Sequence, residues 1–531
     1  MTSFWLPTLS AVLFYLSFYP ANLGPVAWGA LIPLIVFALR EPRGKRVFFA
    51  CWLGGTVFFT AGFAWIHHTA PWVGPAGVGI YMGIYWALFA LILRRLHLVA
   101  GWPVPVAAPL AWITMEYVRS YLFGGLPYLL AGYSQHAALG VIQIADLGGV
   151  WLVSMLVAFV NGAAAQAILH PENSRRWGGA ALALVLVSLV YGSVRLSSLP
   201  SESGPVVGIV QPNIPQDVKN VGRSDPRESR RIFDTHVQLT RELVAKSPKV
   251  ALVVWPESVF QAGLYYHPAS DRWLRTMRFE LLEETVRSVG RPLVSGMLVG
   301  NILRPGDKST PDQELLFDLD METQLEPTNS ALVFDAEGRV AARYDKQRLV
   351  QFTEIMPFEP LLPVRWIVAK FLNVKKVYEF RPGRAPAMFT AGGRTFGVCI
   401  CSENYYPDIW REIARNGASA IVNISNEAWF RESAELDLMH AMTKFRAVEN
   451  RIACVRGTNS GISAVYDAGG RAVQTLEAAD GTRKSVAGTM AVDVPAGPGG
   501  SAYGRLGDAA VALAAGAAVV GLAWSAFLAK R

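Results

Sequence analysis

The chain has 531 residues, too many for one ordinary domain, and 52% of them are hydrophobic while only 17% are charged. Its net charge of +8 comes without a basic run interleaved with aromatic residues and without a zinc-finger, RNA-recognition or helix-turn-helix motif, so we expect no nucleic-acid partner. The four cysteines form no CxxC pair, which excludes a disulfide scaffold and a cysteine zinc site. We therefore expect neither a metal nor a cofactor.

Apolar residues are concentrated in 1–197 and in 508–528, with an ordinary globular mixture between. A helix needs about 20 apolar residues to cross a bilayer core. The distribution predicts a bundle of seven transmembrane helices in 1–197, a globular domain in 198–507 and an eighth transmembrane helix in 508–531. The expected spans are roughly 4–20, 24–39, 47–66, 76–93, 104–120, 141–168, 178–195 and 508–528.

Basic residues in the short connections predict the orientation of the chain. They fall between spans 2 and 3, between spans 4 and 5, between spans 6 and 7 and after the last span, while the connections 20–23 and 67–75 have none. By the positive-inside rule the basic side is cytoplasmic, which places the globular domain outside the cytoplasm. The alternative is that one weak span is false and the domain faces the cytoplasm. The basic residues concerned are Arg40, Arg43, Lys45, Arg46, Arg94, Arg95, Arg175, Arg176, Lys530 and Arg531.

Within 205–500, short β-branched runs alternate with helical patterns. Runs at 205–210, 250–255, 293–296, 330–334, 395–401 and 418–424 are typical of strands, and 227–246 and 439–451 are typical of helices. Buried strands that alternate with helices predict an α/β layered domain, in which catalytic groups gather at strand ends.

Three of these strand ends carry reactive side chains. Glu257 follows the run 250–255 and can act as a general base, although a capping or ion-paired carboxylate has the same pattern. Lys346 follows the run 339–344 and can stabilise an oxyanion, although a surface lysine has the same pattern. A third run ends in Cys399 and Cys401 before a polar turn, which suits a nucleophile, although both can be small core residues.

The order Glu, Lys, Cys, each at a strand end of one domain, resembles the nitrilase superfamily. Segments 329–331, 423–430, 446–450 and 458–461 resemble further motifs of that superfamily. The resemblance implies that Glu257, Lys346 and Cys401 form a catalytic triad. Cys401 is preferred over Cys399 because it takes the place of the nucleophile before x-Glu.

Seven expected helices before this domain and one after it, together with the segment 211–216, resemble the apolipoprotein N-acyltransferase family. The resemblance implies an α+β membrane protein in the bacterial cytoplasmic (inner) membrane, with a periplasmic nitrilase-like α/β sandwich. It also implies ping-pong transfer of an acyl chain from a phospholipid, through a cysteine thioester, to the terminal amine of a diacylated apolipoprotein. The expected partners are therefore the bilayer, a phospholipid donor and an apolipoprotein acceptor.

Supporting roles follow from the same resemblance. Glu354 and Glu403 are expected to orient the lysine and the nucleophile, and backbone amides near Ser402 to assist the oxyanion. Trp255 is expected to be a further supporting or binding residue. Ser402 stands where the family usually has an aromatic residue, and Glu427 where it has Asp. These departures leave open an envelope acyltransferase with another acceptor.

Two further alternatives are a membrane-bound amidase and a transporter or scaffold with an inactive enzyme domain. Segment 355–377 is expected to form an interfacial lid or, alternatively, a helix packed on the core. Glu116 and Arg119, near the fifth expected span, are expected to pair with each other or to bind a headgroup.

Overall fold

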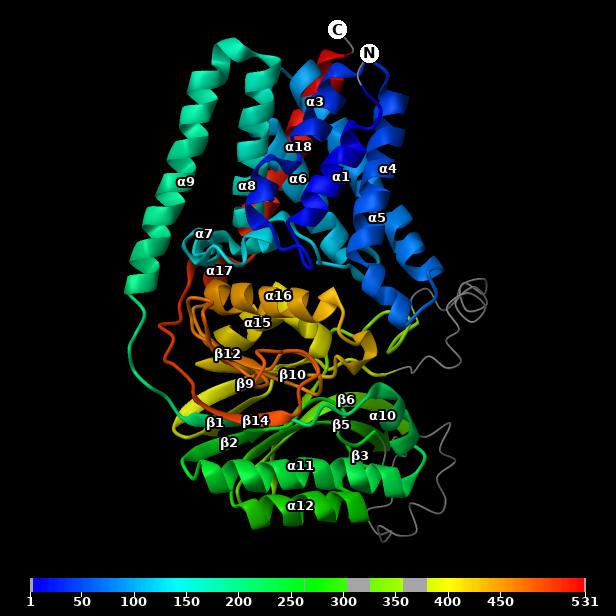
Figure 1. Cartoon of the computed structure of the whole chain (residues 1–531), viewed down its shortest axis with the longest axis vertical. Helices are drawn as coiled ribbons and strands as arrows, with labels where there is room; N and C mark the ends of the chain where they lie inside the picture. The colour runs from blue at the N-terminus through cyan, green and yellow to red at the C-terminus, as the bar shows by residue number, and fades with distance from the viewer. Residues whose placement is uncertain (1–2, 262, 303–324, 357–379, 530–531) are drawn as a thin grey trace.

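The computed structural model describes residues 3–261, 263–302, 325–356 and 380–529. A helical bundle forms one end of the molecule and contains both chain ends, and two layers of β-sheet flanked by helices form the other (Figure 1). Segment 357–379, which holds almost all of the expected lid, lies outside the described residues.

The bundle contains helical structure at each of the eight expected spans. By length and composition, four helices can cross a membrane: Val73–Val99, Ala145–Leu169, Pro171–Ser197 and Ala509–Leu528. Shorter apolar helices cover Leu6–Leu16 and Gly24–Arg40, and the second of these is divided into short pieces. The helices are α1 (Leu6–Leu16), α2 (Ala27–Ala30), α3 (Ile32–Arg40), α4 (Gly44–Gly62), α5 (Val73–Arg94), α6 (Val104–Tyr121), α7 (Leu139–Ile142), α8 (Ala145–Leu169), α9 (Ser174–Ser197) and α18 (Ala509–Leu528), with α17 (Ala502–Leu506) leading into α18.

Two sheets form the α/β domain. The first has eight strands in the order β14-β1-β2-β5-β3-β4, with β6 paired to β5 and to β7. The second has six strands in the order β13-β12-β11-β10-β9-β8. The strands are β1 (Val206–Gln211), β2 (Val250–Val254), β3 (Tyr265–His267), β4 (Arg272–Trp273), β5 (Leu293–Ile302), β6 (Leu325–Phe334), β7 (Val340–Asp345), β8 (Met388–Ala391), β9 (Arg394–Ile400), β10 (Ala420–Ser425), β11 (Ala453–Thr458), β12 (Ala464–Tyr466), β13 (Ala472–Thr475) and β14 (Gly488–Asp493).

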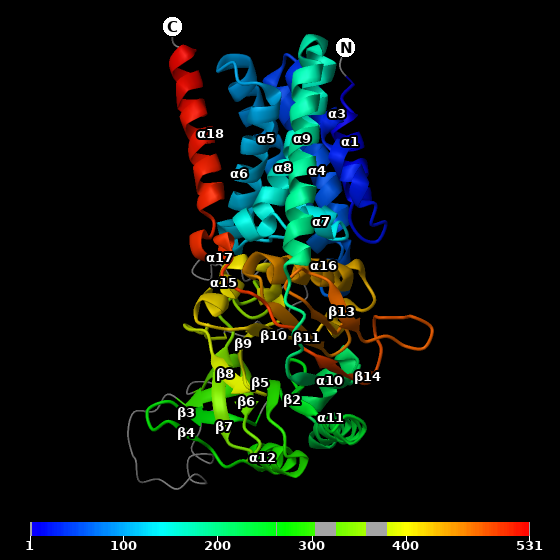
Figure 2. The same cartoon turned by 90° about the vertical axis from the view of Figure 1, so that its left-hand side faces the viewer.

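The two sheets pack face to face, so the domain has four layers. Apolar side chains from both sheets form the core between them, among them Ile209 and Val254 of the first sheet and Val398 and Val422 of the second. Helices α11 (Pro226–Lys246) and α12 (Met277–Val289) cover the outer face of the first sheet, and α15 (Pro407–Arg415) and α16 (Ala434–Asn450) lie between the second sheet and the bundle (Figure 1; Figure 2). The expected α/β layers are confirmed.

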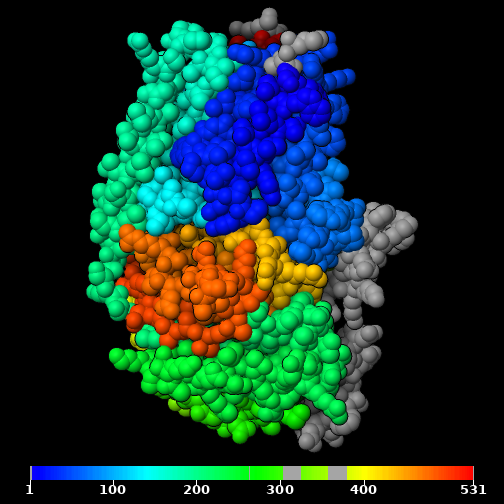
Figure 3. Space-filling view, viewed as in Figure 1, coloured from blue at the N-terminus to red at the C-terminus, as the bar shows by residue number. Residues whose placement is uncertain are grey.

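The bundle and the domain share one hydrophobic core and a buried polar interface. Apolar side chains of the bundle pack continuously with those of α15, α16 and the second sheet, and the space-filling view shows the bundle resting directly on this layer (Figure 3). The Glu449 Oε1 accepts from the backbone N–H of Val150 (2.8 Å), and Arg451 donates to Gln143 Oε1 (2.8 Å). Buried polar groups that pair across the interface between the bundle and the α/β domain fix the position of one relative to the other.

Two buried histidines make the fold sensitive to acid. Burial lowers the pKa of His236 and of His440 to about 3, from an ordinary value of about 6.5. As pH falls below 6.5, these histidines bind protons in the unfolded chain but stay neutral in the native state, so stability present at pH 7 is lost progressively toward pH 3.

We expect the thermal midpoint of the detergent-solubilised chain to fall between pH 7.5 and about pH 5, and to fall less in His236→Gln. The more exposed His170→Gln should keep the wild-type pH dependence, and identical profiles for the three proteins would contradict the assignment.

Candidate active site

Three strand ends from the two sheets meet at one edge of the sandwich. Glu257 follows β2 and Lys346 follows β7 in the first sheet, and Cys401 follows β9 in the second. The charges of Glu257 and Lys346 both act on the Cys401 thiol. The structure therefore brings together the three residues predicted as a triad.

Buried hydrogen bonds hold the carboxylate of Glu257, which is 5% exposed. Its Oε1 accepts from Asn329 Nδ2 (2.7 Å) and its Oε2 accepts from the backbone N–H of Asn426 (2.9 Å). Lys219 Nζ donates to the Glu257 backbone carbonyl (3.1 Å). Gly296 of β5 permits this close approach, because a Cβ there would lie 2.5 Å from the Glu257 Cα. The carboxylate is thus fixed in place without a direct cation on its oxygens in the described structure.

Lys346 is 1% exposed and is held by a second carboxylate. Its Nζ donates to Glu354 Oε1 (3.0 Å), an oxygen that also accepts from Asn329 Nδ2 (2.9 Å). Burial favours the neutral amine, but the Glu354 carboxylate outweighs it and raises the pKa of Lys346 above its ordinary value, helped by the Cys401 sulfur once it is deprotonated and by the Glu257 carboxylate. The side chain remains an ammonium, which is the form that can stabilise an oxyanion.

Cys401 begins a sharp turn. Its φ of 51° is left-handed, and the 3₁₀ helix Cys401–Tyr405 starts at this residue. Burial and the Glu257 carboxylate raise the pKa of the Cys401 thiol to about 12, against the opposing effects of Lys346 and a hydrogen bond with Ser425. The sulfur therefore carries its proton at neutral pH and needs a base to become a nucleophile.

Cys399 lies two residues earlier and packs elsewhere. It is fully buried in the core shared with α15, α16 and the bundle. Its Sγ accepts from Asn423 Nδ2 (3.3 Å). This placement is that of a structural cysteine, and it agrees with the choice of Cys401 as the nucleophile.

Glu403 ties the nucleophile turn to the lysine turn. Its Oε2 accepts from the Ile400 N–H (2.7 Å). Its Oε1 accepts from Tyr344 Oη (2.7 Å) and from the N–H groups of Gln347 (2.7 Å) and Arg348 (3.1 Å). Because these donors come from both sheets, the buried carboxylate fixes Lys346 relative to Cys401.

Ser402 and Trp255 occupy different surroundings. Ser402 is buried, and its Oγ donates to the Arg348 carbonyl at 3.5 Å, a long contact. Trp255 is fully buried on the α11 side of the first sheet, where its Nε1 donates to Thr240 Oγ1 (2.8 Å) and its ring packs on Phe233. Its indole thus packs on the side of the sheet away from the second sheet, and a supporting role for it stays a prediction.

Two asparagines were missed as site residues by sequence reasoning. Asn329 Nδ2 bridges the carboxylates of Glu257 and Glu354. Asn426 fixes Glu257 through its backbone, and its side chain accepts from Asn459 Nδ2 (2.9 Å). A buried asparagine inside the strand that precedes the lysine strand was a signal, but its partners are distant in the chain.

Behind the nucleophile lies a buried ion pair. Arg456 of β11 pairs with Glu427 and donates to Asn423 of β10. Glu427 Oε1 also accepts from Ser425 Oγ (3.0 Å). After Lys346, Ser425 is a second residue that lowers the pKa of Cys401. The glutamate that replaces the usual aspartate therefore supports the site by holding Ser425, the last residue of β10.

Comparisons with known proteins cover both parts of the chain. Residues 10–163 match the family model of the apolipoprotein N-acyltransferase N-terminal domain, and residues 206–494 match that of carbon-nitrogen hydrolase. An apolipoprotein N-acyltransferase of Geobacter metallireducens is 32% identical over 96% of this chain and 93% of that protein. The chain belongs to the apolipoprotein N-acyltransferase family.

A second relative matches nearly the whole chain, whereas the solved structures match little more than half of it. An apolipoprotein N-acyltransferase of Rhodopirellula baltica is 26% identical over 98% of this chain and 97% of that protein. Among solved structures, an amidase from Nesterenkonia sp. AN1 is 17% identical, with a TM-score of 0.37, over 58% of this chain and 98% of that one. A branch 10 nitrilase-superfamily protein of Saccharomyces cerevisiae is 15% identical, with a TM-score of 0.38, over 55% of this chain and 91% of that one. The resemblance found in the sequence is confirmed by the family models and the curated relatives.

The electrostatic link between Lys346 and Cys401 can be tested without any substrate. Lys346 lowers the pKa of the thiol, so Lys346→Met should raise it and reduce the thiolate fraction at a given pH. We expect alkylation of Cys401 by iodoacetamide at pH 8.5 to slow by about tenfold or more. Lys249→Met, at an exposed lysine, is the matched control, and Cys401→Ala defines background labelling. Equal alkylation of wild type and Lys346→Met would show that the ammonium does not act on the sulfur.

Proposed function

We propose that this chain catalyses apolipoprotein N-acylation: it takes an acyl chain from a phospholipid, holds it as a thioester on Cys401 and transfers it to the terminal amine of a diacylglyceryl-cysteine lipoprotein. The observation that carries the proposal is one thiol set between a fixed carboxylate and a buried ammonium. The site lies in a domain whose core continues into a bundle of apolar helices. A lipid donor and a lipid-anchored acceptor both suit a site beside a membrane.

In the first half-reaction, Glu257 accepts the proton of the Cys401 thiol and the sulfur attacks the ester carbonyl of the phospholipid. The negative charge that develops on the carbonyl oxygen is stabilised by the Lys346 ammonium and by backbone amides near Ser402. The C–O bond of the ester breaks, the departing oxygen takes the proton from Glu257, and lysophospholipid leaves. The acyl chain remains as a thioester.

In the second half-reaction, the neutral amine of the lipoprotein attacks the thioester carbonyl. Glu257 accepts a proton from the amine, and Lys346 again stabilises the oxyanion. The C–S bond breaks, the sulfur recovers the proton from Glu257, and an amide is released. Because Glu257 is held by Asn329 and Asn426, the same carboxylate can serve as base and then as acid in both halves.

The proposed topology has eight transmembrane helices, with the α/β domain on the periplasmic side of the bacterial cytoplasmic membrane. Three of the four basic segments lie at the α3–α4 connection, at the end of α5 and at the α8–α9 turn. These places are at the end of the bundle remote from the sheets (Figure 1). The fourth, Lys530 and Arg531, lies outside the described residues. The basic connections between helices thus lie at the end of the bundle away from the catalytic domain, and this placement supports the proposed orientation.

Intact-mass measurement after mixing the enzyme with phospholipid tests the reaction class. We expect one acyl adduct on Cys401, release of lysophospholipid, and loss of the adduct when a diacylated lipopeptide is added. Cys401→Ala and Glu257→Gln should form no adduct, and Lys346→Met should form it about a hundred- to a thousandfold more slowly, the usual effect of losing one oxyanion donor. Cys399→Ala is the matched cysteine control and should form the adduct.

Two outcomes of this experiment, run together with an ammonia-release assay on small amides, separate the alternatives. Ammonia release from small amides without an adduct from phospholipid would replace the proposal with a membrane-bound amidase. A stable adduct that other amines, but not the lipopeptide, discharge would indicate an envelope acyltransferase with a different acceptor.

A further inference from the structure

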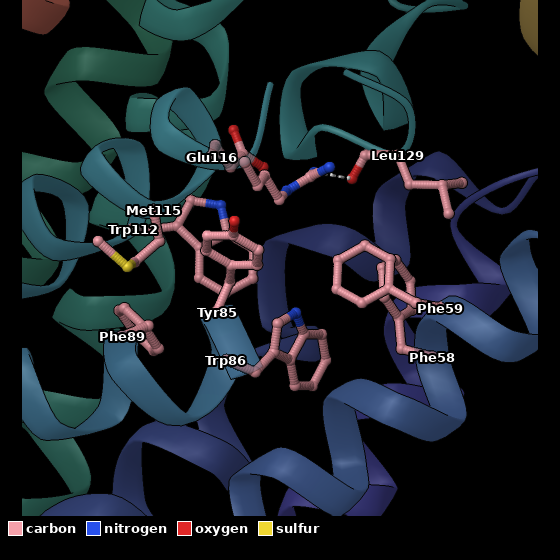
Figure 4. Close-up of a pocket in the computed structure, with 10 residues that line it drawn as sticks. Phe58, Phe59, Tyr85, Trp86, Phe89, Trp112, Met115, Glu116 and Leu129 are labelled. Carbon is pink, nitrogen blue, oxygen red and sulfur yellow. Dashed lines mark hydrogen bonds between the residues drawn. The ribbon is translucent and has the colours of Figure 1, made fainter. Parts of the chain in front are cut away.

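Two charged side chains near the end of α6 bind the same segment of backbone. The Arg119 guanidinium donates to the carbonyls of Leu126 (3.1 Å), Tyr128 (2.8 Å) and Leu129 (3.1 Å). It also lies over the Phe59 ring, 5.1 Å from its centroid. Figure 4 shows the bond to Leu129 at the edge of a small pocket lined by aromatic rings. All of these partners belong to the bundle or to the segment that follows α6.

Glu116 binds the other end of that segment. Its Oε1 accepts from the backbone N–H of Ala131 (2.7 Å). No ion pair joins Glu116 to Arg119 among the described residues, so the two do not form the simple pair expected from their spacing. Residues 126–130 are irregular, and Leu129 adopts a left-handed φ of 55°. Such a segment keeps its shape only where its carbonyl and amide groups have firm partners.

The segment carries one side chain into the catalytic domain. The Tyr128 ring lies 4.8 Å from that of Tyr405, the last residue of the turn that Cys401 begins. Its hydroxyl donates to Glu435 Oε1 (3.3 Å) in the first turn of α16. Tyr128 is buried. A chain of direct contacts therefore runs from the Arg119 guanidinium to the nucleophile turn.

We propose that Arg119 is a positioning residue for acyl transfer: by holding the carbonyls of 126–129 it seats Tyr128 against Tyr405 and so fixes the turn that presents Cys401. This inference rests on the proposed function, and it assigns to a charge in the helical bundle a part in the chemistry of the other domain. A planar guanidinium suits the task, because several donors in a rigid fork reach carbonyls that one ammonium does not reach together. A small displacement of a nucleophile is enough to slow a reaction about a hundredfold.

Arg94 offers a matched control. It also binds several backbone carbonyls, those of Ala38, Glu41 and Pro42, but at the opposite end of the bundle from the sheets. Arg119→Lys and Arg94→Lys thus remove the same kind of contact at two places. We expect Arg119→Lys to slow the burst of acyl-enzyme formation by about ten- to a hundredfold, with little change in the phospholipid concentration that gives half the maximal rate. Arg94→Lys should keep the wild-type burst even if its thermal midpoint falls equally.

A double-mutant cycle tests the route through Tyr128. Tyr128→Ala should itself slow the burst, and adding Arg119→Lys to it should change the rate by less than about threefold, because the segment then has nothing left to position. Equal slowing by the two lysine variants, or independent multiplicative effects of Arg119→Lys and Tyr128→Ala, would overturn the inference. If Arg119→Lys does not fold, a wild-type burst in Tyr128→Ala would overturn it alone.

Alkylation of Cys401 by iodoacetamide, measured on the same full-length variants, keeps the two proposals apart. It needs no lipid, so a wild-type protein that is alkylated but never acylated would count against the proposed function. Arg119→Lys should change the alkylation rate and Arg94→Lys should not; equal rates in both would count against the positioning role.

Discussion

A buried ammonium among carboxylates is the interaction on which the site depends. Lys346 and the Glu257 carboxylate are buried, and the Glu354 carboxylate is mostly buried. An isolated charge in such a place would be strongly destabilising. Lys346 pairs directly with Glu354, and Asn329 joins that pair to Glu257 through one amide nitrogen. The cluster can then keep a carboxylate base and an ammonium beside a neutral thiol, because the positive charge of Lys346 compensates the nearby negative charges. Removing one member changes the protonation of the others.

Residues from two sheets form this cluster, and Glu403 fixes the position of one sheet edge relative to the other. Its four accepted bonds join the end of β9 to the turn after β7, so nucleophile and ammonium move together. Gly296 lets the segment with Glu257 pass close to β5, where any larger residue would push it away. Backbone groups and buried acceptors thus hold the reacting groups, and no hydrogen bond among the described residues joins Glu257, Lys346 and Cys401 directly.

The bundle does more than place this chemistry near lipid. Its core is continuous with that of α15 and α16, and its irregular segment after α6 packs on the nucleophile turn. Charges inside the bundle would be difficult to explain as parts of a simple anchor. Their hydrogen bonds to backbone groups of the packed segment give them a structural task that reaches the catalytic domain.

The sequence by itself determined the apolar ends and the α/β domain between them, because apolar runs and residue periodicity are local properties of a chain. The three reactive residues were predicted from their places at strand ends together with the resemblance to a known order of motifs. It could also favour Cys401 over Cys399, through motif position. Only the tertiary structure decided that Asn329 bridges two carboxylates, that the Trp255 ring packs behind the first sheet, and that Arg119 and Glu116 bind a segment of backbone. The longest of these contacts joins Asn329 to Glu257, 72 positions away. Side-chain direction and backbone partners follow from how the sheets and helices pack, which no local pattern contains.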